Sequence, residues 1–131
     1  MKFNFSALPW QLIFAPGAVQ QLPDEMDKRS LKRALVLSTP QQDHHLDMIA
    51  DLIGARFAGG FAQAVMHVPV ETVAAAQVAA RSVDADCTIS IGGGSTTGLG
   101  KALALKSDLA NIAIPTTYAG SEMTNVWGMT E

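Results

Sequence analysis

Residues 89–101 carry the pattern with the clearest chemical meaning in this 131-residue sequence. An apolar stretch runs into three glycines, residues 92–94, which are followed by Ser95, Thr96 and Thr97 and then by a helical pattern. This order predicts a tight turn between the carboxyl end of a strand and the start of a helix. Unpaired backbone amides and the helix dipole favour a phosphate group there. Glycine lets a ligand approach the backbone closely, and the hydroxyl groups can cap the helix or donate to phosphate oxygens.

Two further glycines, Gly98 and Gly100, fall inside the first turns of the expected helix, where each costs about 1 kcal/mol relative to alanine. Close approach of a ligand or of another backbone would offset that cost. The alternative is that the glycines only end the strand and let the helix pack closely on the sheet. The spacing matches neither Gly-x-Gly-x-x-Gly nor a Gly-Lys-Ser/Thr loop. Residues 111–117 also hold no carboxylate that could read a ribose.

A second polar segment, residues 115–124, follows the next apolar block. Adjacent parallel strands end on the same side of a sheet, so this loop is expected to face the glycine-rich turn across a crevice. Thr116, Thr117 and Ser121 would supply neutral hydroxyl donors for phosphates and sugars. The alternative interpretation is an ordinary polar turn after a strand.

Four short apolar blocks, each typical of a strand covered on both faces, alternate with helical patterns. The expected strands are residues 33–38, 63–68, 87–92 and 111–115, and the expected helices between them are residues 41–56, 70–83 and 95–106. This alternation predicts an α/β fold with a mostly parallel sheet and helices on both faces. Gly59 and Gly60 are expected to form a turn.

The first residues follow a different pattern. Residues 3–5 and 11–15 predict a short N-terminal strand pair, either an edge hairpin or an arm exchanged between subunits, and residues 18–26 predict a short helix. Near the other end, Trp127 and Met129 are expected in a further strand or hairpin.

Other candidate residues favour structural roles. His44 and His45, flanked by Asp43 and Asp47, point to different helix faces and so predict a solvated helix start rather than a metal site. His67 ends an expected strand and is expected to be a packed histidine or one at the edge of the sheet, rather than a functional one. Cys87 is expected to be a small core residue rather than a nucleophile. Lys101 either neutralises ligand charge or is simply solvated, and we expect the chain to bind no metal.

Composition restricts the class of protein. The length fits one domain, and 48% hydrophobic with 16% charged residues predicts a folded core. The formal charge of −3 argues against nonspecific nucleic-acid binding. A single cysteine excludes an intrachain disulfide and fits a reducing compartment. No apolar run has the length of a signal peptide or membrane span, which predicts a cytoplasmic protein without membrane partners.

Together, the two polar segments resemble the iron-containing alcohol dehydrogenase family. The shared features are residues 92–95 with Lys101, and then residues 115–117 with Ser121 and Glu122. More narrowly, the full stretches are similar to those of maleylacetate reductases. Two departures from the wider family, Gly98 in place of its usual aspartate and a threonine loop one residue shorter, are shared by maleylacetate reductases.

This resemblance implies a Rossmann-like dinucleotide-binding domain over residues 1–131, NADH or NADPH as cofactor, and a homodimer. The cofactor-binding positions that it implies are Ser38, Thr39, Pro69, Gly92, Gly93, Gly94, Ser95, Thr96, Thr116, Thr117, Tyr118, Ser121 and Met123. Residues 92–96 would hold the pyrophosphate, and Ser38 and Thr39 would lie at the adenosine ribose. Thr39 would not repel a 2′-phosphate and has no neighbouring arginine to attract one, so the choice between NADH and NADPH stays open.

The implied activity is hydride transfer to the double bond of maleylacetate, a small dicarboxylate, giving 3-oxoadipate during the catabolism of aromatic compounds. The family continues into an all-helical domain that carries its catalytic histidines. We therefore expect the catalytic groups to lie after Glu131 and this chain alone to be inactive. The alternatives are a fragment of a metal-dependent alcohol dehydrogenase or a non-catalytic nucleotide-binding module.

Overall fold

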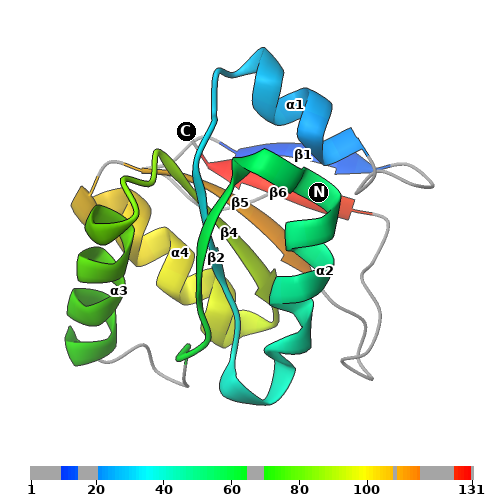
Figure 1. The fold of residues 1–131 in the computed structure, drawn as a ribbon. Helices are drawn as coiled ribbons and strands as arrows, with labels where there is room; N and C mark the ends of the chain where they lie inside the picture. The colour runs from blue at the N-terminus through cyan, green and yellow to red at the C-terminus, as the bar shows by residue number, and fades with distance from the viewer. Residues whose placement is uncertain (1–9, 15–20, 65–69, 108, 116–125, 131) are drawn as a thin grey trace.

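A computed structural model describes residues 10–14, 21–64, 70–107, 109–115 and 126–130 (Figure 1). It confirms the α/β fold, with helices on both faces of one six-stranded sheet. The strands are β1 (Trp10–Phe14), β2 (Ala34–Leu37), β3 (Phe57–Phe61), β4 (Cys87–Gly92), β5 (Ala110–Pro115) and β6 (Val126–Thr130). The α-helices are α1 (Leu22–Lys28), α2 (His44–Ile53), α3 (Val70–Ser82) and α4 (Gly94–Ser107), and two 3₁₀ turns, η2 (Pro40–Gln42) and η3 (Gly54–Arg56), flank α2.

The sheet has the order β1-β6-β5-β4-β2-β3. The four strands β3, β2, β4 and β5 are parallel, whereas β6 runs antiparallel to both β5 and β1. Trp10 pairs with Thr130 and Phe14 with Val126. The strand predicted over residues 11–15 thus corresponds to β1, and the strand that the structure pairs with it is β6, near the other end of the sequence. This pairing confirms the strand expected around Trp127 and Met129. The expected strand over residues 3–5 lies outside the described residues.

Alternate residues of the central strands point to opposite faces and build two cores. Val36 and Ile89 pack on the face covered by α1 and α2, while Leu35 and Leu37 pack under α3 and α4. Figure 1 shows these helix pairs on the two sides of the sheet. In the described part of the chain, no helix combines the length and apolar content that a membrane crossing requires.

The third strand corrects two expectations. β3 spans Phe57–Phe61, not residues 63–68, and Gly59 and Gly60 lie inside it rather than in a turn. A Cβ on Gly59 would lie 3.1 Å from Val83 Cγ1, and one on Gly60 would lie 2.8 Å from Leu46 Cδ1. The two glycines therefore leave room for the elements that pack on this strand. Residues 63 and 64 form a loop, and residues 65–68 lie outside the described part.

Candidate functional site

The glycine-rich turn lies where β4 ends at Gly92 and α4 begins at Gly94. Gly92 has φ +141°, in the region that favours glycine. The Thr97 amide donates to the Gly93 carbonyl at 3.1 Å, which starts the helical hydrogen-bond pattern. By helix geometry, the amides of the three preceding residues, 94–96, have no acceptor inside α4. The sequence prediction of an amide-rich turn at this strand end is confirmed.

Two polar side chains lie close to the position that a Cβ atom on Gly92 would occupy. An ideal Cβ there would lie 3.0 Å from Thr96 Oγ1 and 3.2 Å from Gln42 Oε1. A Cβ on the exposed Gly93, in contrast, would meet nothing within 4 Å. The turn is therefore closed around Gly92 and open at Gly93.

Thr96 also carries an unsatisfied polar atom. Its side chain is fully buried, and its hydroxyl has no hydrogen-bond partner among the described residues. A buried hydroxyl left without a partner costs about 1–3 kcal/mol. A phosphate oxygen at the turn could accept from this hydroxyl and from the helix amides. The residues present thus fit a bound diphosphate.

The position of the Gln42 side chain at this turn was not predicted from the sequence. Gln42 lies in η2, just after β2, and β2 is the parallel neighbour of β4. Its position after a strand end next to the glycine-rich strand is the one signal that could have identified it.

Ser38 and Thr39 follow β2 at the same edge of the sheet. Ser38 is fully buried, and its hydroxyl donates to the Thr39 carbonyl at 3.0 Å. Its backbone accepts from the Ala64 amide and donates to the Phe61 carbonyl, both at 3.1 Å. Ser38 therefore ties the ends of β2 and β3 together, while Thr39 is half-buried. Their contact with an adenosine ribose stays a prediction.

Several predicted site residues lie outside the described residues, namely Pro69, Thr116, Thr117, Tyr118, Ser121 and Met123, together with His67. Their roles remain predictions. Lys101 is half-buried in α4, and this desolvation lowers the pKa of its ammonium group. Cys87 is fully buried in the core, as expected, and burial raises the pKa of its thiol.

The structure explains Gly100 without a ligand. Thr88 and Ser90 on β4 each donate a hydroxyl hydrogen bond of 2.8 Å to Asn111 Oδ1 on β5. All three side chains are fully buried. A Cβ on Gly100 would overlap Ser90 Oγ and Asn111 Oδ1. For this glycine, close packing of α4 on the sheet is therefore the correct alternative.

The histidine pair corrects another expectation. His44 is exposed, but His45 is fully buried, so the expected solvated helix start is wrong for His45. His45 lies on the same face of α2 as the core residues Ile49 and Ile53. Among the described residues, no three His, Cys, Asp or Glu side chains group closely enough to hold a metal ion.

Burial, followed by the charge of neighbouring His44, lowers the pKa of His45 from its ordinary value of 6.5. Below that pH the unfolded chain takes up a proton that the folded chain does not. Stability is therefore expected to fall with acidification below about pH 6.5, by up to about 1.4 kcal/mol per pH unit, until folded His45 also protonates. Urea unfolding at pH 7.5 and pH 5.5 should show a smaller loss for His45→Leu than for the native sequence. An equal loss in both would contradict this assignment.

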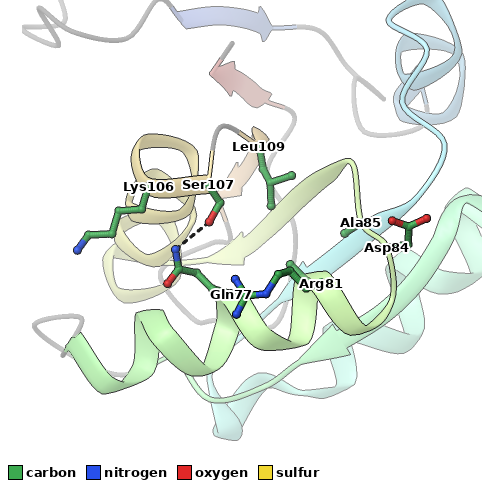
Figure 2. A pocket seen from close by; sticks show the side chains of 8 residues that line it. Gln77, Arg81, Asp84, Ala85, Lys106, Ser107 and Leu109 are labelled. Carbon is green, nitrogen blue, oxygen red and sulfur yellow. Dashed lines mark hydrogen bonds between the residues drawn. The ribbon is translucent and has the colours of Figure 1, made fainter.

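A pocket of about 550 Å³ lies between α3 and α4 (Figure 2). Gln77 Nε2 donates to Ser107 Oγ at 2.9 Å across it, and Arg81 and Lys106 line it. Both helices end here, and β5 begins nearby. The pocket therefore lies at the amino ends of the parallel strands, whereas the glycine-rich turn lies at their carboxyl ends. The carboxyl ends of helices carry partial negative charge, which disfavours a phosphate.

Comparison with known proteins finds relatives along nearly the whole length of the chain. The family model described as iron-containing alcohol dehydrogenase matches residues 9–131. Maleylacetate reductase of Sphingobium indicum is 52% identical over 131 residues, which are 100% of this chain and 37% of that protein. The crystal structure of maleylacetate reductase from Agrobacterium tumefaciens shares 49% identity at a TM-score of 0.80, covering 92% of this chain and 35% of that one.

A more distant structure shows the fold alone. Sulfoacetaldehyde reductase from Bifidobacterium kashiwanohense, in complex with NAD+, has a TM-score of 0.69 at 19% identity. It covers 79% of this chain and 33% of that one. The present chain thus spans well under two thirds of the length of each of these relatives.

Proposed function

Because this chain belongs to the iron-containing alcohol dehydrogenase family, we propose that it forms the dinucleotide-binding part of a maleylacetate reductase. The similarity to maleylacetate reductases over the whole chain supports this choice within the family. In the proposed reaction, NADH or NADPH reduces maleylacetate to 3-oxoadipate.

The observation that carries the proposal is the turn between β4 and α4. Helix amides without intrahelical acceptors, Gly92 with its positive φ, and the Thr96 hydroxyl, which has no partner in the described part of the chain, meet at one end of the sheet. Ligands of open α/β sheets bind at the carboxyl ends of their strands. A diphosphate there would satisfy the Thr96 hydroxyl and complement the α4 dipole.

The chain's own residues would bind and orient the cofactor, while the cofactor supplies the hydride. Residues 92–96 would fix the diphosphate and thereby place the nicotinamide at the edge of the sheet. Groups that bind the substrate carboxylates and deliver a proton would come from a helical domain beyond this chain. We further propose that the whole protein is a cytoplasmic homodimer. Thr39 would neither repel nor attract the 2′-phosphate of NADPH, so the proposal includes both NADH and NADPH.

The experiment that tests this function uses the protein expressed from the whole reading frame that contains the chain. We expect it to consume NADH or NADPH when maleylacetate is added and to release 3-oxoadipate. The 131-residue chain, assayed in parallel, is expected to show no turnover. Turnover by the isolated chain would contradict the proposed division of roles. Alcohol oxidation that depends on added metal, without maleylacetate reduction, would instead identify a metal-dependent alcohol dehydrogenase.

A further inference from the structure

Gln42 is held at the sheet edge by a short, stiff turn. The turn η2 begins with Pro40 and ends at Gln42. The proline ring fixes the φ angle of Pro40. The backbone N–H of Gln42 donates to the Thr39 carbonyl at 3.1 Å, and this hydrogen bond closes the turn directly after β2. The side chain is half-buried. The backbone of Gln42 is thus fixed before any ligand arrives.

From this position the side chain reaches the neighbouring strand. β2 and β4 are parallel neighbours, with Leu37 paired to Ser90 two residues before Gly92. Gln42 Oε1 lies 3.2 Å from the ideal Cβ position of Gly92, and Thr96 Oγ1 lies 3.0 Å from the same point. Polar atoms from two separate elements therefore converge beside Gly92, next to the opening of the turn at Gly93.

A primary amide has the right chemistry for an anion at this point. The amide group of glutamine offers two N–H donors and one acceptor, and rotation about its last bond exchanges their positions. Turned this way, Gln42 Nε2 would donate to a phosphate oxygen from the β2 side, while Thr96 and the amides of α4 donate from the other side. The amide is also neutral and therefore does not repel the ligand.

We propose that Gln42 is a cofactor-binding residue that donates a hydrogen bond to the diphosphate of the dinucleotide. This inference rests on the proposed function, because it places the diphosphate at the glycine-rich turn. The proposed site would then include a side chain from the connection after β2 as well as the turn between β4 and α4. The diphosphate would accept hydrogen bonds from both sides rather than from the helix terminus alone.

The test measures ADP and NADH binding by calorimetry, on the protein from the whole reading frame, for Gln42→Glu, Gln42→Leu and the control Gln41→Glu. Gln41 precedes Gln42 in the same turn and is exposed, so its substitution adds the same charge beside the site. Gln42→Leu is expected to weaken both ligands about fivefold through the lost hydrogen bond. Gln42→Glu should weaken both about thirtyfold because a carboxylate would face the diphosphate. Gln41→Glu should change affinity less than about twofold.

The outcomes separate the two levels of the proposal. If the native protein binds neither ADP nor NADH, the proposed function is wrong and this inference is wrong with it. If it binds both, and both Gln42 variants bind them as tightly as Gln41→Glu, only the role of Gln42 is overturned. Should Gln42→Glu fail to fold, the Gln42→Leu result decides.

Discussion

Substitution of Gly92 by alanine is expected to weaken dinucleotide binding by at least about a hundredfold. The new Cβ would lie 3.0 Å from Thr96 Oγ1 and 3.2 Å from Gln42 Oε1, where these groups converge. The backbone would also have to leave φ +141°, which side-chain-bearing residues rarely adopt. Both effects displace the amides that would face the diphosphate. Calorimetric titration with NADH measures the loss.

Gly54→Ala is a matched control for the backbone effect. Gly54 has φ +60° at the end of α2, and a Cβ there would meet nothing within 4 Å. Its substitution should cost about 1–3 kcal/mol of stability, because φ +60° with ψ −123° is strained for a residue with a side chain, and should leave NADH affinity unchanged. A folded Gly92→Ala variant that binds NADH as tightly as Gly54→Ala would show that the turn does not hold the cofactor.

Gly100→Ala is expected to cause the largest loss of stability, about 3 kcal/mol or more. Helix propensity alone would make alanine stabilising by about 1 kcal/mol, so the sign of the change is diagnostic. The Cβ would overlap Ser90 Oγ and Asn111 Oδ1 and force α4 away from the sheet. The two buried hydrogen bonds to Asn111 would then also be strained. Urea unfolding gives the free energy difference.

Two further variants check the cause of that loss. Adding Thr88→Val, Ser90→Ala and Asn111→Ala to Gly100→Ala removes the overlapping atoms without leaving the buried Thr88 hydroxyl unpaired, and should recover at least about half of the lost stability. Gly93→Ala, whose Cβ would meet nothing within 4 Å, should be close to neutral. The packing account is wrong if Gly100→Ala is as stable as Gly93→Ala.

The fold and the turn could be predicted because their signals are local. The apolar spacing of α3 and the glycines after β4 define these elements in the sequence itself, and both were placed within about one residue. β3 could not be predicted, because Gly59 and Gly60 carry no strand preference and are explained only by the neighbours they accommodate.

The missed residues are polar residues whose surroundings are set by tertiary packing. Gln42 and His45 lie in a polar segment that reads as solvated, yet the segment folds against the sheet and buries His45. Asn111 starts an apolar block, and only the pairing of β4 with β5 reveals that it accepts from Thr88 and Ser90. Local sequence does not encode such contacts between distant residues.

Amide NMR during titration with ADP tests most directly whether the turn after β4 binds a diphosphate. We predict that the largest shifts fall on the amides of Gly93, Gly94, Ser95 and Thr96. The titration can be repeated with Gly92→Ala, for which these shifts should disappear. Shifts concentrated instead on Gln77, Arg81 and Ser107, at the pocket of Figure 2, would contradict the account.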